Sequence, residues 1–567
     1  MRNLTNTSAR PARRILALAM ALCLLAAMLP AASFAAVSGD YQYEFYDYQD
    51  GDQTLIGARI IKYTGTDNTV SIPDLLGGCV VTAIGEGAFS NCAELDEVVI
   101  SSSVINIERY AFYNCISLTR IVIPDAVSFI GHAAFHATPW LANQSDDDYV
   151  IVGDGVLIRF NNDTATDAVI PDDVRHIAVE AFWEHPTLTN VTIPDGVISI
   201  ADYAFRNCRL ESITIPESVS QLGDYVFVGC ANLSNATLPS GLTQIAKGLF
   251  DSCVNLKSIE IPNGVKSIGD GTFNYCGKLS NVTIPYGVID IGNNAFYGCA
   301  TMKSMVIPAS VTRIGAYAFG GCSGLTEIVI PNSVSEIGDS AFYACVGLTE
   351  IAIPRGISHI ERSVFSGCTG LTEIIIPDNI TKIGTFAFRE CFRLTEIVIP
   401  NSVSEIDMGA FYFCTGVTRV TIASSVSRLG THAFGGFYSL EEVYFKGTSP
   451  VLDREAGNSY VFDDAPPSLT LYYPASLTDD WAPNGEMTWK GYKIAPYTLV
   501  EYGDANGDNK ITAADAALIL RYIVRLDPLT GQGLANADAN GDGKITAADA
   551  ALILRFIVKL ENKLGSK

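Results

Sequence analysis

Residues 331–353 read PNSVSEIGDSAFYACVGLTEIAI, and this stretch decides the fold because the chain repeats its pattern many times. The clearest marker is a proline after an aliphatic residue, which returns every 23 residues after one step of 22. These prolines are Pro194, Pro216, Pro239, Pro262, Pro285, Pro308, Pro331, Pro354, Pro377 and Pro400. A fixed period in this range indicates stacked structural repeats.

The apolar residues of one unit cannot be buried by that unit alone. In the quoted unit they are Val334, Ile337, Ala341, Phe342, Cys345, Leu348, Ile351 and Ile353. Each unit can cover them only with the units before and after it, so the stack itself forms the core. We therefore expect a β-rich solenoid of about 15 coils.

Irregular units mark the limits of the repeat region. Earlier units are centred on Pro73, Ser101, Pro124 and Pro171, and a late unit has Ala423 in the proline position. The long gap before Pro171 contains an insertion at about residues 137–168, whose alternating pattern predicts an added strand or hairpin. The predicted boundaries are an N-terminal cap at 36–72, the solenoid at 73–445 and a C-terminal cap at 446–499.

The recurring pattern IGxxAFxxCxxLTxIxIPxxV covers about residues 60–450. It resembles the BspA-like, or Treponema-type, leucine-rich repeats of bacterial surface and secreted proteins. The resemblance implies a leucine-rich-repeat solenoid in which the Leu-Thr-x-Ile-x-Ile segment of each unit is a short strand. It also implies a surface for a protein or glycan ligand, which it does not identify because one scaffold can carry many different surfaces.

A second duplication lies near the end of the chain. The segment DANGDNKITAADAALILRYIVRL begins at Asp504, and DANGDGKITAADAALILRFIVKL begins 34 residues later at Asp538. In each copy side-chain oxygens fall at loop positions 1, 3, 5, 9 and 12, with a backbone carbonyl at 7, which is the ligand spacing of a hard cation. The predicted ligands are Asp504, Asn506, Asp508, the carbonyl of Lys510, Thr512 and Asp515 in the first loop, and Asp538, Asn540, Asp542, the carbonyl of Lys544, Thr546 and Asp549 in the second.

Each of these loops is predicted to lead directly into one helix. Thr512 and Asp515 have the spacing of a capping box, as do Thr546 and Asp549. No helix is expected before either loop, because the stretch YTLVEYG before Asp504 is typical of extended chain. The apolar stripe expected along the first helix contains Leu518, Tyr522, Ile523 and Leu526.

Two half-EF-hand loops with Asp at position 12, each followed by one helix, resemble a type I dockerin over residues 500–567. The resemblance implies a small α-helical module that binds two Ca²⁺ ions and the cohesin domain of a scaffoldin. The cohesin contacts that it implies are Ala513, Ala514, Leu520, Arg521, Arg525, Ala547, Ala548, Leu554, Arg555 and Lys559. Because the two sets are nearly identical, we expect binding in either of two orientations related by a half-turn. The alternative is that the alanines only favour helix formation.

The N-terminus predicts a secreted, extracellular protein, and the resemblance to a dockerin implies that it is associated with a cellulosome or a cell surface. Residues 1–35 combine four arginines, an apolar run from Ile15 to Leu29 and small residues near Ala35, which is typical of a secretory signal. Removing this segment takes the formal net charge from −24 to −28, so a phosphate backbone would be repelled and nucleic-acid binding is not expected. No later segment has the roughly 20 apolar residues of a membrane span.

Several residue types return at one position of successive coils. Of the 14 cysteines, the nine from Cys230 to Cys414 share the 23-residue period and are interpreted as small core residues, with disulfides between adjacent coils as the alternative. His132 and His136 are four residues apart, but no third metal ligand accompanies them. A further position, for which surface packing is favoured over a platform for sugar rings, contains Tyr113, Trp183, Tyr297, Tyr343 and Tyr412.

The sequence contains no GxSxG motif, no P-loop and no other catalytic constellation. It therefore predicts a secreted, non-catalytic protein that a dockerin attaches to a cellulosome and whose repeats bind a protein or glycan. One alternative is a cell-surface adhesin tethered through a cohesin. A second alternative is a glycoside hydrolase with an unrecognised site in the insertion or the caps, which would need a carboxylate pair in a cleft.

Overall fold

The computed structural model describes residues 35–50, 53–145, 147–452, 460–497, 502–506, 510–529, 531–558 and 564. Of the secretory signal expected at 1–35, only residue 35 belongs to this set. The chain divides into two compact units, residues 1–356 and 357–567, and each is described by itself. Among the described residues, no helix combines the length and the hydropathy needed to cross a bilayer.

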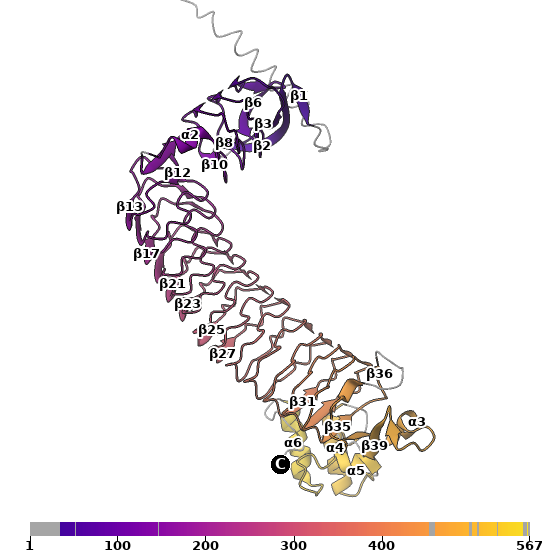
Figure 1. Cartoon of the computed structure of the whole chain (residues 1–567). Coiled ribbons are helices and arrows are strands. Elements are labelled where there is room, and N and C mark those ends of the chain that lie inside the picture. Colours follow the sequence, from indigo (N-terminus) through magenta and orange to yellow (C-terminus); the bar gives the residue numbers. More distant parts are fainter. Residues whose placement is uncertain are drawn as a thin grey trace, which may run out of the picture. The chain divides into compact units, whose positions relative to one another are not determined.

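The first unit is a solenoid with two columns of short parallel strands (Figure 1). It begins with an antiparallel arrangement of β1 (Ala36–Ser38), β2 (Tyr41–Asp50) and β3 (Gln53–Tyr63). One column contains β4 (Thr69–Ser71), β7 (Glu97–Val99), β9 (Arg120–Val122), β13 (Asp167–Val169), β15 (Asn190–Thr192), β17 (Ser212–Thr214), β19 (Asn235–Thr237), β21 (Ser258–Glu260), β23 (Asn281–Thr283), β25 (Ser304–Val306) and β27 (Glu327–Val329).

The other column of the first unit contains β6 (Cys79–Ile84), β8 (Asn106–Ile107), β10 (Phe129–Ile130), β12 (Val156–Phe160), β14 (His176–Ile177), β16 (Ser199–Ile200), β18 (Gln221–Leu222), β20 (Gln244–Ile245), β22 (Ser267–Ile268), β24 (Asp290–Ile291), β26 (Arg313–Ile314) and β28 (Glu336–Ile337). Two further strands pair antiparallel with members of this column, β5 (Leu75–Leu76) with β6 and β11 (Tyr149–Val152) with β12. In both columns, the regular register places each residue opposite the equivalent residue of the next repeat. Ile314, for example, lies opposite Ile337.

The second unit continues the same architecture and ends in a group of helices. Its strands are β29 (His359–Ile360), β30 (Lys382–Ile383), β31 (Glu396–Ile399), β32 (Glu405–Ile406), β33 (Arg419–Ile422), β34 (Arg428–Leu429), β35 (Glu442–Phe445), β36 (Val451–Leu452), β37 (Thr470–Pro474), β38 (Thr488–Trp489) and β39 (Tyr492–Tyr497). Its helical segments are η1 (Tyr460–Phe462), η2 (Ala475–Leu477), α3 (Thr478–Trp481), α4 (Ala513–Ile523), α5 (Gly531–Asn536) and α6 (Ala547–Ile557).

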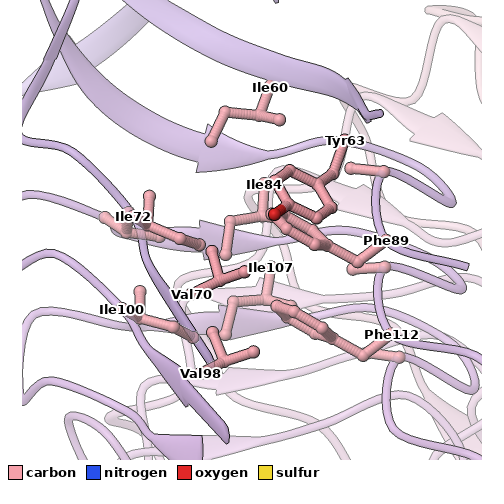
Figure 2. Close-up of a cluster of buried hydrophobic side chains, with 14 of the residues drawn as sticks. Ile60, Tyr63, Val70, Ile72, Ile84, Phe89, Val98, Ile100, Ile107 and Phe112 are labelled. Carbon is pink, nitrogen blue, oxygen red and sulfur yellow. The ribbon is translucent and has the colours of Figure 1, made fainter. Parts of the chain in front are cut away.

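A column of stacked aromatic rings fills the centre of each solenoid. Figure 2 shows its beginning, where Tyr63, Phe89 and Phe112 lie above one another with 5.0 Å between neighbouring ring centroids. Beyond the insertion the first unit resumes this stack, with spacings from 4.8 Å to 5.9 Å. All eight apolar residues predicted to be buried in the unit 331–353 are buried, which confirms the stack as the core.

The cysteine column is part of this core and forms no disulfide among its described members. From Cys208 to Cys322, each Sγ donates a hydrogen bond to the carbonyl of the phenylalanine in the preceding coil, at 3.0–3.3 Å. The donor and acceptor pairs in the centre of the first unit are Cys208 and Phe182, Cys230 and Phe205, Cys253 and Phe227, Cys276 and Phe250, Cys299 and Phe273, and Cys322 and Phe296. The interpretation as core residues is confirmed, and the thiol also satisfies a carbonyl in each coil.

The chain forms about 19 turns rather than the roughly 15 expected. The additional turns are coils without the proline marker: β3 pairs in parallel with β6, and β37 pairs in parallel with both β35 and β39. These irregular regions still supply a ring to the stack, in the form of Tyr63, Phe160 and Phe462. The motif undercounts the coils because stacking requires an apolar residue at the buried position and not the whole consensus.

The insertion interrupts the stack of the first unit. The hairpin expected there is confirmed, since β11 pairs antiparallel with β12, and a short helix α2 (Pro139–Ala142) precedes it. Trp140 of α2 covers Phe135 edge to face, with ring centroids 4.9 Å apart. Strand β10 ends one sheet and β12 belongs to the next, so the regular ladder stops between them.

The thiols of the core column should resist alkylation in the native chain. Burial raises the pKa of Cys208 and of Cys322 to about 12, whereas a hydrogen bond with Cys115 lowers the pKa of the half-buried Cys92. Because the thiolate is the reactive form, a maleimide at pH 8 should label Cys92 first and the buried column only after unfolding. Peptide mapping by mass spectrometry measures the order. Cys92→Ala should remove the fast phase, and rapid native labelling of Cys253 would contradict the buried ladder.

Candidate functional site

The two duplicated segments fold into a pair of helices that pack against each other. Helices α4 and α6 contribute equivalent residues to one small core, Ala516 and Ile519 from the first and Ala550 and Ile553 from the second. The remaining buried members of this core are Ala505, Leu529, Ala537 and Ala539. The predicted stripe is therefore correct only in part, because Leu518 and Tyr522 border this core whereas Ile523 and Leu526 are exposed.

Both helices begin with the capping box predicted from the sequence. The Thr512 hydroxyl accepts a hydrogen bond from the Ala514 N–H, and Asp515 accepts one from the Thr512 N–H at 2.8 Å. Thr546 and Asp549 repeat these contacts at the start of α6, again with 2.8 Å between the Thr546 nitrogen and the Asp549 carboxylate. Such a box satisfies N–H groups that the first turn of a helix leaves without partners.

The second loop is wound around its own acidic and amide side chains. The carboxylate of Asp538 accepts hydrogen bonds from the N–H groups of Asp542 and Gly543, at 3.0 Å and 2.7 Å. The Asn540 side-chain oxygen also accepts from the Asp542 N–H, at 2.9 Å. Gly543 has a φ of 81°, a conformation that glycine adopts freely.

The first loop shows the same contacts where it is described. Asp504 is buried, and the Asn506 N–H donates to Asp515 at 3.1 Å, just as the Asn540 N–H donates to Asp549 at 3.1 Å. The backbone carbonyl of Asp504 accepts from the side-chain amide of Asn536, at 2.9 Å. Asp508, predicted at loop position 5, lies outside the described residues.

The buried carboxylates suit a bound cation. Asp515 and Asp549 are each 0% exposed and accept hydrogen bonds through both oxygens, and a buried carboxylate is costly unless hydrogen bonds or a positive charge compensate it. Within the described part of the chain, no three His, Cys, Asp or Glu side chains form a metal-binding group on their own. A Ca²⁺ ion would therefore also need neutral oxygens from Asn540, Thr546 and the carbonyl of Lys544, as oxygen-rich calcium loops provide.

A short helix before the second loop corrects one expectation. We expected no helix there, but α5 runs from Gly531 to Asn536 and ends two residues before Asp538. A Cβ added to Gly533 would lie 2.6 Å from the Ala505 carbonyl oxygen, so α5 approaches the first loop closely. Six residues with two glycines carry little apolar periodicity, and this tertiary approach is not visible in the sequence.

The residues predicted to contact a cohesin form exposed faces on both helices. Ala513, Ala514, Leu520, Arg521 and Arg525 are exposed on or just after α4, as are Ala547, Ala548, Leu554 and Arg555 on α6, while Lys559 lies outside the described residues. Leu520 and Leu554 are each 43% exposed, so the two faces match closely. Arg521 also forms an ion pair with Asp527, which raises the pKa of the guanidinium and lowers that of the carboxyl.

Sequence reasoning missed the apolar extension of these faces. Val524 and Val558 are each 63% exposed, and Ile523 and Ile557 are each 38% exposed. Their spacing from Leu520 and Leu554, at three and four residues, is the signal that would have identified a second apolar stripe. Exposed apolar residues at matched positions on two helices are typical of a protein-binding surface.

Comparisons with known proteins identify two families. The model of the BspA type leucine rich repeat region matches in six copies, over residues 57–144, 158–259, 243–370 and 335–456. The model of the dockerin type I domain matches residues 502–558. No curated protein matches the chain.

Solved structures of leucine-rich repeat proteins resemble the chain. A protein from Bacteroides ovatus is 27% identical, with coverage of 78% of this chain and 100% of that chain and a TM-score of 0.47. A leucine rich cell surface protein from Faecalibacterium prausnitzii is 24% identical, with coverage of 74% of this chain and 97% of that chain and a TM-score of 0.26.

Removing one capping hydroxyl should weaken the corresponding helix. Thr546→Ala deletes the side-chain acceptor at the start of α6 and should cost about 1 kcal/mol of local stability. Hydrogen–deuterium exchange in peptides covering residues 547–557 should become faster, while Thr546→Ser should retain the wild-type rate. Thr512→Ala should produce the same change in α4, and unchanged exchange in both alanine variants would contradict the capping role.

Proposed function

This chain belongs to the family of BspA-type leucine-rich repeat proteins and carries a C-terminal type I dockerin domain, and from this premise we propose that it is a secreted, non-catalytic component of a cellulosome. Type I dockerin domains bind cohesins, and leucine-rich-repeat solenoids bind proteins. The dockerin would attach the chain to a scaffoldin through a cohesin, and the repeats would hold a protein or glycan ligand.

The observation that carries this proposal is the structural equivalence of the two duplicated segments wherever both are described. Asp515 and Asp549 are equally buried, and Leu520 and Leu554 are equally exposed. Loop, cap and exposed face are therefore duplicated together, as a module with two equivalent binding faces requires. This equivalence supports binding of a cohesin in either of two orientations.

We further propose that two Ca²⁺ ions fold the dockerin. The ligands would be Asp504, Asn506, Asp508, the carbonyl of Lys510, Thr512 and Asp515 in one loop, and Asp538, Asn540, Asp542, the carbonyl of Lys544, Thr546 and Asp549 in the other. Type I dockerin domains bind calcium. Without the ion, carboxylates gathered at one loop repel one another, so metal binding and folding should be coupled.

The repeat region supports a binding role rather than catalysis. Both matched families are non-catalytic in type, and they contain no catalytic domain. The solenoid offers long columns of exposed side chains, among them Val306, Val329 and Ile375 on the strand face. Exposed apolar residues on a rigid scaffold favour adhesion to a ligand on a cell, a fibre or a neighbouring protein.

The first experiment is a binding assay of the full chain on a panel of type I cohesins. With calcium present, at least one cohesin should bind, and EDTA should abolish that binding. Asp504→Ala combined with Asp538→Ala should abolish it as well, because each loop loses its first ligand. Calcium retention without binding to any cohesin would contradict the scaffold role and would favour a free adhesin.

The two orientations can be separated by mutating one face at a time. Ala513→Asp with Ala514→Asp, or Ala547→Asp with Ala548→Asp, should lower cohesin affinity only about twofold, because one of two equivalent poses remains. Aspartate in the first turn of a helix suits the helix dipole, so these variants should fold. Combining all four substitutions should abolish binding. Loss of binding from one pair alone would show a single orientation.

A further inference from the structure

The interruption of the first solenoid unit opens a cleft that a regular stack would close. Between β10 and β12 the ladder stops, and two cavities of about 860 and 580 Å³ lie at this point. A third cavity, of about 380 Å³, adjoins them on the coils that follow. The two larger cavities share Tyr110, His132 and Glu180, and the largest and smallest share Phe129 and Asp202. They therefore form one continuous groove across the coils on both sides of the break.

Aromatic side chains are distributed along this groove. Phe129, on the last strand before the break, is 42% exposed and lines the largest cavity together with Tyr110 and Tyr203. Trp183 is 43% exposed and lines the adjoining cavity with Tyr113. Tyr110 and Tyr113 meet edge to face at 82°, and Tyr203 stacks on Tyr225, so the exposed rings are those of Phe129 and Trp183. An exposed ring in a concave site can bind a flat apolar surface, such as the C–H face of a sugar ring.

The polar lining contains carboxylates that are held in ion pairs. Glu86 pairs with Arg109 at 2.6 Å, and Glu108 pairs with Arg59 at 2.9 Å. A carboxylate in an ion pair retains lone pairs that can accept further hydrogen bonds. Additional hydroxyl and amide groups in the lining come from Asn106, Ser128, Ser199 and Gln221.

One contact joins the two walls of the groove. His132 Nδ1, from the coil before the break, lies 2.6 Å from a carboxylate oxygen of Glu180, from the coil after it. Arg206 Nη1 lies 3.9 Å from the other Glu180 oxygen and places its guanidinium 5.8 Å from the centroid of the Tyr203 ring. Glu180 is thus held in position between the two larger cavities.

We propose that this groove binds a neutral oligosaccharide. Aromatic faces would stack on the sugar rings, while the compensated carboxylates, amides and hydroxyls would hydrogen bond to sugar hydroxyl groups. An anionic ligand is disfavoured because the largest cavity is lined by four carboxylates, those of Glu86, Glu108, Glu180 and Asp202, and by one guanidinium, that of Arg109. This inference rests on the proposed function, since it assigns a ligand class and a site to the repeat region.

Tyrosines on later coils of the same unit pack against one another. Tyr275 and Tyr297 meet at an interplanar angle of 85°, and Tyr317 meets Tyr343 at 70°. Rings that meet edge to face pack against one another and do not present one flat surface. This agrees with the surface packing favoured for Tyr297 and Tyr343.

The test is isothermal titration of the full chain with cellohexaose, xylohexaose and mannohexaose. At least one should bind, with an affinity that changes little between 50 mM and 500 mM NaCl because the ligand is uncharged. Phe129→Ala should weaken that affinity about tenfold or more, while Phe129→Trp should retain it. The matched control is Tyr286→Ala, an aromatic residue that is 80% exposed on the same unit and outside the groove, and it should bind as the wild type does.

A second variant probes the polar wall. Glu180→Gln keeps the shape of the side chain but removes the charge that pairs with His132, and it should also weaken binding. Unaltered thermal unfolding of each variant shows that the effect is local. If none of the three oligosaccharides binds, or if binding survives Phe129→Ala and Glu180→Gln, the proposal is overturned. Cohesin binding measured on the same preparations separates this outcome from failure of the scaffold role.

Discussion

The repeat region depends on one constraint, which is that a 23-residue coil cannot enclose its own aromatic ring. Phe273, for example, is completely buried only because Phe250 and Phe296 stack on its two faces. Burial of such a ring contributes about 1.5–3 kcal/mol, and each coil receives this contribution only from its neighbours. The free energy of folding is therefore spread along the chain as a sum over adjacent coils. The buried thiols from Cys208 to Cys322 add to this coupling, because each one donates to a carbonyl of the preceding coil.

The features that could be predicted from the sequence are those governed by periodicity or by short-range contacts. The eight buried positions of 331–353 follow from one repeat, since every coil has the same environment. The capping boxes at Thr512 and Thr546 involve residues only three positions apart. The families suggested by these patterns are the ones that match the chain.

The features that could not be predicted depend on contacts between distant segments. Helix α5 approaches Ala505 through Gly533, and its own six residues have no strong helical pattern. The coils without a proline marker join the stack because residues such as Phe462 happen to meet a neighbouring ring. The groove requires His132 and Glu180 to meet across the insertion, although nothing in either local sequence relates them.

The interruption at α2 shows how such a chain tolerates an added segment. In a globular domain, an insertion disturbs packing in several directions, whereas here it removes only the pairing between one coil and the next. The stack resumes at once, with Phe160 against Phe182 and Phe182 against Phe205. The energetic penalty is thus confined to a single junction and does not grow with the number of coils. Insertion at a junction is consequently a route by which a repeat protein can acquire a new concave surface during evolution without any change to the remainder of its core.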